Sequence, residues 1–168
     1  MIDHYIRQYG KRLYGLCITL CANPFDADDL YQDTWLKVVK NISQYDPAQE
    51  FEPWLTKICV NTYRNALRRI MKSPIFDGFA GDEVKTAVLE SASQPEPHEP
   101  PDYSYLHEAI EKLPEKLRLT IILFYFREMD LDETAEVLNI PVGTVKSRLN
   151  KARNMLREVL ADETDIYI

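Results

Sequence analysis

The sequence predicts an all-α protein: two small helical bundles joined by an acidic, proline-rich linker, the second bundle containing a helix-turn-helix. Apolar residues recur every three or four positions on both sides of residues 73–103, which is the period of a helix with one buried face. Five glycines in 168 residues are too few for the many turns of an all-β fold. Four of the eight residues 94–101 are proline, which excludes a regular helix there. We therefore expect domains at 1–72 and 104–168 and a linker at 73–103.

Composition narrows the class of protein further. The chain has 20 Lys and Arg against 27 Asp and Glu, a formal charge of -7, and 45% hydrophobic residues, which is typical of a globular protein. Domains this small are expected to be tight helical bundles rather than enzyme-sized cores. No apolar run approaches the ~18 residues of a spanning helix, and the start of the sequence lacks a signal-peptide pattern. These features predict a cytoplasmic protein without membrane insertion.

The three cysteines do not suggest chemistry. Cys17 and Cys21 lie one helical turn apart, and Cys59 stands alone in the sequence. Together with His4 or His107 they match no zinc spacing. We expect buried, reduced thiols, no metal and no cofactor.

Charge is segregated along the chain, and this pattern points to function. Residues 53–73 hold five bases and no acid, and so do residues 141–157, whereas residues 73–102 hold seven acids and one base. Two basic blocks separated by an acidic spacer favour nucleic-acid contact over a uniformly solvated surface, although two charged helix faces without a partner remain the alternative.

The first domain holds an acidic helix and a basic helix. After the break at Asn23-Pro24, the spacing of Ala27, Leu30, Thr34 and Val38 predicts one buried helix face. The opposite face is a candidate docking set for a basic partner. The alternative is that its acids only stabilise the helix through its dipole. This set is Asp26, Asp29, Gln32, Asp33 and Trp35.

The basic helix is expected from Trp54 to Lys72. Its predicted buried side is Leu55, Ile58, Cys59, Thr62, Ala66 and Ile70. Its opposite side, where bases alternate with asparagines suited to phosphates and base edges, is Lys57, Asn61, Arg64, Asn65 and Arg68. Tyr45, Phe51 and Trp54 stand in a loop just before this helix, where their rings either stack on unpaired bases or plug the end of the bundle.

The sequence of the second domain predicts a helix-turn-helix. Leu113-Pro114-Glu115 opens a helix whose buried stripe is Leu117, Ile121 and Phe124. Asp130 and Glu133 have the spacing of a capping box, and Asn139 suits a tight turn. In the helix that follows, the predicted buried residues are Val142, Val145, Leu149, Ala152 and Leu156. The candidate base-reading residues, near the start of this helix, are Thr144, Lys146, Ser147, Arg148, Asn150 and Lys151. An ordinary helical corner with a solvated face is the alternative.

These segments together resemble the extracytoplasmic-function class of bacterial RNA polymerase sigma factors. Residues 26–36 (DADDLYQDTWL) resemble that family's polymerase-docking helix. Residues 51–55 (FEPWL) and 61–69 (NTYRNALRR) resemble its segment that melts and reads the −10 promoter element, and residues 113–116 (LPEK) and 141–149 (PVGTVKSRL) its −35-reading domain. The departures are Asn65, where the family often has Asp, and Asn150 and Lys151, where it often has an aromatic or His followed by Arg; they bear on which promoter is read.

The resemblance implies a mechanism and partners. The docking set would bind the clamp of the largest subunit of core RNA polymerase, and the second domain would bind the flap of the next largest. Phe51, Trp54, Lys57, Asn61, Arg64, Asn65 and Arg68 would hold the −10 element, and the candidate base-reading residues the −35 element. An anti-sigma factor, often membrane-bound, would hold the protein inactive. The alternatives are a stand-alone helix-turn-helix regulator, a small Cys/His enzyme and a helical scaffold.

Overall fold

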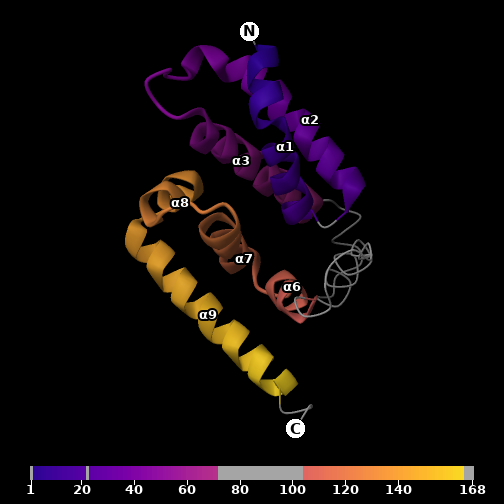
Figure 1. The fold of residues 1–168 in the computed structure, drawn as a ribbon, viewed down its shortest axis with the longest axis vertical. Helices are drawn as coiled ribbons and strands as arrows, with labels where there is room; N and C mark the ends of the chain where they lie inside the picture. The colour runs from indigo at the N-terminus through magenta and orange to yellow at the C-terminus, as the bar shows by residue number, and fades with distance from the viewer. Residues whose placement is uncertain (1, 22, 72–103, 165–168) are drawn as a thin grey trace. The chain divides into compact units, whose positions relative to one another are not determined.

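The protein is described here by a computed structural model, which covers residues 2–21, 23–71 and 104–164; within these ranges every regular element is helical. The chain separates into two compact units. The all-α prediction is confirmed for the part of the chain that the structure covers (Figure 1). The linker prediction falls on residues outside this part, so the expected domain boundaries stay a prediction.

The first unit is a bundle of three helices, each packed against the other two. They are α1 (Ile2–Cys21), α2 (Pro24–Asn41) and α3 (Phe51–Met71), with a short 3-10 turn, η1 (Ile42–Gln44), after α2. Asn23 caps α2, because its side-chain oxygen accepts a hydrogen bond from the backbone N–H of Asp26 at 2.9 Å, and Pro24 fills the first turn. An ion pair between Arg12 and Glu52, 3.0 Å apart, joins α1 to the start of α3.

The core of this unit is apolar and closely follows the expected helix faces. All four residues predicted to be buried on α2 are buried. The large side chains that fill the centre are Leu13, Leu16, Leu20, Val38 and Val60.

In the second unit, three short helices pack along one long helix. The short helices are α6 (Ser104–Glu111), α7 (Glu115–Ile121) and α8 (Leu131–Leu138), and the long one is α9 (Val142–Thr164) (Figure 1). The sequence reading did not include α6, although its Ile110 joins the apolar core with Leu117, Ile121 and Leu149. Pro114 stands just before α7, as expected of a helix start.

The capping box and the turn are confirmed. Asp130 accepts the backbone N–H of Glu133 at 2.8 Å, and Glu133 in return accepts the backbone N–H of Asp130 at 3.0 Å. Asn139 ends α8 in the left-handed conformation, with φ 55° and ψ 51°. α8, this turn and α9 form the predicted helix-turn-helix.

A π-helical segment, η3 (Ile122–Phe126), continues α7. The backbone N–H of Arg127 bonds to the carbonyl of Ile122 at 3.0 Å, five residues back rather than four. Ile122 and Leu123 are buried, whereas Phe124 is half-buried and packs against the apolar core of this unit. The expected burial of Phe124 is therefore only partly met.

None of the helices that the structure describes is both long enough and apolar enough to cross a membrane.

Candidate nucleic-acid and protein interfaces

The first half of α9 presents a polar, basic surface above a buried apolar stripe. Val145, Leu149 and Ala152 are buried, which fixes the rotation of the helix. Of the candidate base-reading residues, Lys146, Ser147, Asn150 and Lys151 are exposed, and Thr144 and Arg148 are half-buried at the edges. We call these six residues the α9 surface.

Local hydrogen bonds order the start of this surface. The N–H groups of Thr144 and Val145 donate to the carbonyl of Pro141 at 3.0 and 3.2 Å, and Ser147 Oγ donates to the carbonyl of Thr144 at 3.0 Å. Farther along α9, Arg153 Nε donates to the hydroxyl of Tyr125 in η3 at 2.7 Å. Arg153 is thus tied to its own unit, whereas Lys146 and Lys151 are exposed on the surface.

The basic face of α3 forms as predicted. Asn61, Asn65 and Arg68 are exposed, and Lys57 and Arg64 are half-buried on the same side of the helix. The apolar side differs: Ala66 and Ile70 are exposed, so their predicted burial is wrong. They have the right helical phase, but a residue in phase is buried only where another element covers that turn.

Phe51 is not in a loop, contrary to the sequence prediction. α3 begins at Phe51 rather than at Trp54, so both residues lie in the first helical turns and not in a loop. The Phe51 side chain is 4% exposed and stacks on Tyr5 with ring centroids 4.0 Å apart. Its ring also contacts Tyr45 and Trp54, at centroid distances of 5.3 and 5.5 Å. No face of Phe51 is left for a base, because α1 supplies aromatic rings that the sequence reading did not include.

Trp54 is half-buried at the edge of this aromatic cluster and lies on the same side of α3 as Lys57 and Asn61. The loop before it is held by Asp46, whose carboxylate accepts the N–H of Ala48 at 2.9 Å and whose carbonyl accepts the N–H of Gln49 at 3.0 Å. Burial, reinforced by the neighbouring Tyr5 and Tyr9, raises the pKa of Tyr45 above its ordinary value. The hydrogen bonds of Asp46 and the packing of Tyr45 therefore hold this loop in place beside the basic face of α3.

The outer side of α2 combines acids with apolar side chains. Asp29, Gln32 and Asp33 are exposed as predicted, and Asp26 is exposed but accepts a hydrogen bond from Asn23 Nδ2 at 2.7 Å. Trp35 is 7% exposed and packs edge-on against Tyr31, so its expected exposure is wrong. Trp35 borders the buried stripe of α2, and its ring turns inward.

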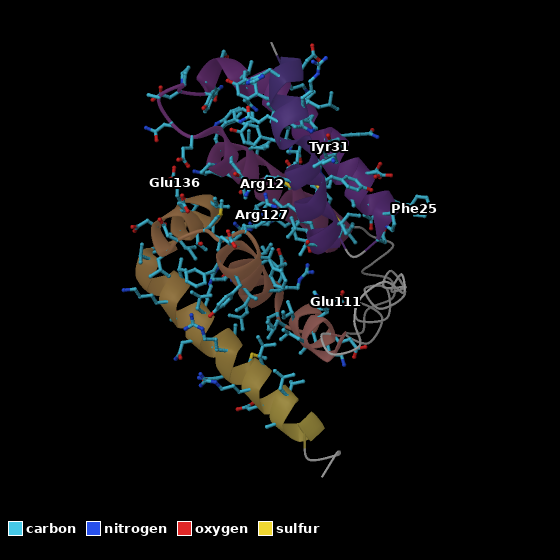
Figure 2. The ribbon with its side chains drawn as sticks, viewed as in Figure 1. Arg12, Phe25, Tyr31, Glu111, Arg127 and Glu136 are labelled. Atoms are coloured by element: carbon cyan, nitrogen blue, oxygen red, sulfur yellow. The ribbon has the colours of Figure 1, made fainter. Side chains whose placement is uncertain are left out.

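The candidate docking set also lacked the exposed apolar residues of α2, which are Phe25, Leu36 and Val39. Phe25 is 83% exposed and Leu36 is 60% exposed, and Figure 2 shows Phe25 projecting outward from the helix. With Asp29 and Gln32 they are spaced by four, three and four residues, so they form one stripe opposite the buried face. That spacing was the signal in the sequence. We call Phe25, Asp29, Gln32 and Leu36 the α2 stripe.

A tyrosine joins the acidic part of α2 to α1. Tyr14 Oη donates a hydrogen bond to Asp28 Oδ1 at 2.7 Å. This hydrogen bond is the main cause that raises the pKa of Tyr14 above 10.0, with burial and the charge of Asp28 adding to it.

The expected burial of the thiols is confirmed for Cys17 and Cys59, and Cys21 is half-buried. Cys17 of α1 and Cys59 of α3 are both completely buried, and their Sγ atoms lie 3.8 Å apart. Cys59 is therefore not isolated in space. Among the residues that the structure covers, no group of three His, Cys, Asp or Glu side chains could hold a metal ion.

A helix-turn-helix with a basic second helix, together with a basic face on α3, is typical of proteins that bind DNA. Comparison with known proteins identifies the family. Residues 5–72 match the family described as Sigma-70 region 2, and residues 103–156 match Sigma-70, region 4.

Curated relatives and solved structures agree with these matches. The chain is 32% identical over 160 residues to the ECF RNA polymerase sigma factor SigW of Bacillus subtilis, covering 92% of this chain and 86% of that protein. It is 28% identical to the ECF RNA polymerase sigma factor SigE of Mycolicibacterium smegmatis, over 95% of this chain and 61% of that one. Its fold matches the sigma factor RpoE of Bartonella quintana, solved with the anti-sigma factor NepR, with a TM-score of 0.71, 21% identity and coverage of 95% and 96%.

The chain belongs to the sigma-70 family of RNA polymerase sigma factors, in its extracytoplasmic-function class. It binds core RNA polymerase and directs promoter-specific initiation of transcription.

Proposed function

We propose that the α9 surface reads the −35 element as duplex DNA. The observation that carries this proposal is the exposure of Lys146, Ser147 and Lys151 above a buried stripe, at the start of a helix that a capped helix and a left-handed turn hold in place. In a helix-turn-helix the N-terminal part of the second helix enters the major groove, where hydroxyl and ammonium groups reach base edges and phosphates.

The basic face of α3 binds the −10 element. Lys57, Arg64 and Arg68 supply positive charge for phosphates, and Asn61 and Asn65 offer amide groups for base edges. Trp54, at the end of this row, provides the aromatic edge for an unstacked base. The buried ring of Phe51 contacts the rings of Trp54 and Tyr45 and holds them in position.

Core RNA polymerase docks on the α2 stripe together with Asp33. The apolar Phe25 and Leu36 would be buried against the clamp of the largest subunit, and the acids would pair with its bases. The second unit would contact the flap of the next largest subunit, and the linker would thread between the two contacts. Bond-making chemistry belongs to the polymerase, so the chain itself is not an enzyme and needs no cofactor.

An anti-sigma factor completes the set of partners. The Bartonella quintana relative was solved with one, and a fold shared over nearly the whole chain supports the same kind of partner here. Such a partner would hold this cytoplasmic protein away from polymerase, at the membrane if the partner is anchored there.

The test is run-off transcription with bacterial core RNA polymerase on a promoter library, with and without the chain. We expect transcripts that depend on the chain and that share −35 and −10 elements. Lys151→Glu should reduce transcript from such a promoter at least tenfold, because it places a negative charge against phosphates. Lys112→Glu, an equal charge change at an exposed position outside the α9 surface, should leave it unchanged.

Two outcomes would contradict the proposal. Equal loss with both variants would show that net charge matters and the α9 surface does not. A chain that shifts duplex DNA tightly alone while core polymerase ignores it would point to the stand-alone regulator.

A further inference from the structure

A pair of thiols lies in the core of the first unit, at a place where neither DNA nor polymerase is proposed to bind. Cys17 and Cys59 come from α1 and α3, are 42 residues apart in sequence, and have Sγ atoms 3.8 Å apart. Both are completely buried. A disulfide needs a sulfur separation of about 2.05 Å, so the two atoms must approach by roughly 1.8 Å, a distance that side-chain rotation and a small helix shift can supply.

The third cysteine does not compete for this bond. Cys21 is half-buried and one helical turn after Cys17. Cβ atoms one turn apart on a helix are about 5–6 Å apart, whereas a disulfide needs about 3.5–4.5 Å. Pairing of Cys17 with Cys21 would therefore require α1 to unwind.

We propose that Cys17 and Cys59 form a reversible disulfide within the folded protein under a two-electron oxidant such as hydrogen peroxide. One thiol attacks the peroxide, its sulfur becomes a sulfenic acid, and the first water leaves. The second thiol then attacks the sulfenic sulfur, the S–S bond forms, and the hydroxyl leaves as a second water with the remaining thiol proton. Peroxide takes up the two electrons, and a dithiol such as dithiothreitol reverses the reaction by exchange.

The burial of the two sulfurs determines how fast the disulfide forms. Peroxide reaches these sulfurs only when α1 and α3 separate briefly, so the reaction is slower than that of an exposed thiol but leads directly to the disulfide, because the partner is adjacent. The bond then links α1 to the helix that carries the proposed −10 face. Cross-linking a loop of this length is expected to raise the Tm of the first unit by about 10 °C.

The experiment treats the purified full-length chain with hydrogen peroxide, removes the oxidant, and alkylates the remaining thiols under denaturing conditions. We expect one intramolecular bond, a mass loss of about 2 Da before alkylation, and one remaining thiol. Trypsin should release residues 13–37 joined to residues 58–64, and fragmentation should place the bond on Cys17. Dithiothreitol should restore the mass, the thiol count and the original Tm.

Two variants and one solvent control sharpen the result. Cys21→Ser should form the bond as the native chain does, and Cys17→Ser should not. Oxidation in guanidinium chloride should give mixed pairings, which shows that the native pairing depends on the fold. The proposal is overturned if the peptide map of the native chain shows three alkylated thiols, a bond at Cys21, or only links between chains, and this map decides even if Cys17→Ser fails to fold.

Discussion

Asn139 occupies a backbone conformation that most side chains avoid, at φ 55°, in the turn between α8 and α9. Asparagine tolerates this region because its short amide can bond locally, and glycine tolerates it because it has no Cβ. Asn139 therefore suits this position of the turn better than a residue with a larger or apolar side chain.

Replacing Asn139 by alanine should lower the free energy of unfolding of the second unit by about 1 kcal/mol. Asn139→Gly is the matched control and should stay within a few tenths of a kcal/mol of the native value. Both tryptophans, Trp35 and Trp54, lie in the first unit, so circular dichroism in urea reports both units and tryptophan fluorescence only the first. A shift in the fluorescence transition would contradict the local explanation.

The hydrogen bond between Tyr14 and Asp28 should be visible in alkaline titration. The pKa of Tyr14 is raised in the folded protein, so the stabilisation from its protonated form is fully present below pH 10 and is lost as the pH rises through the folded pKa. The stability difference between the native chain and Tyr14→Phe should shrink across that range. Ultraviolet absorbance should show one late-titrating phenol fewer in Tyr14→Phe, and Asp28→Asn should move that phenol back toward 10.0; an unchanged titration in both would exclude the bond.

At the scale of an element, α2 shows what helical periodicity can and cannot reveal. The spacing of apolar residues identified its buried face correctly, but Trp35 lies at the border of that face, where phase alone does not tell which way a large ring turns. The exposure of Phe25 and Leu36 follows from the same periodicity, because their spacing places them on the side of α2 opposite its buried face.

Phe25→Ala should weaken binding to core RNA polymerase by about tenfold, since a phenyl ring buried only in the complex loses its contact area. The free energy of unfolding should change by less than about 0.5 kcal/mol, because the ring is exposed in the free chain. Ile70→Ala removes an exposed apolar side chain from α3 and is the matched control for competition binding. Equal affinity of Phe25→Ala and the native chain would remove Phe25 from the docking surface.

In the basic helices α3 and α9, some features follow from the local sequence and others depend on contacts between helices. Capping residues, the turn and the polar faces of α3 and α9 follow from local rules and were predicted. The burial of Phe51 depends on Tyr5 and Tyr9 of α1, and the pairing of Cys17 with Cys59 depends on how α1 crosses α3. Contacts between segments far apart in one sequence leave no periodic signal.

At the scale of the whole molecule, a formal charge of -7 opposes DNA binding although two faces are basic. We expect the free chain to bind −35 duplex weakly and the polymerase complex to bind it tightly, because docking adds contacts that offset the repulsion of the acidic segments. Electrophoretic mobility shifts with and without core polymerase, at matched salt, measure this difference. Tight binding by the free chain would contradict it.

The predicted linker gives the whole chain a second test. Lys85 is the only trypsin site within residues 73–103. If that segment is a tether, brief digestion should cut at Lys85 first and leave two resistant fragments, one carrying α1 to α3 and the other α6 to α9. Earlier cleavage at the arginines of α9 would contradict the predicted boundary.

The π-helical turn at η3 acts as a one-residue insertion carried inside a helix. Deleting one residue there would restore the ordinary spacing of an α-helix, and the flanking turns would keep their orientation, because the wider turn is what accommodates the extra residue. If the residue lost is Tyr125, Arg153 loses the hydroxyl that accepts the hydrogen bond from its Nε. A deletion of one codon at this point should therefore leave the helix in place, and a chain without this tyrosine should anchor α9 by a different contact.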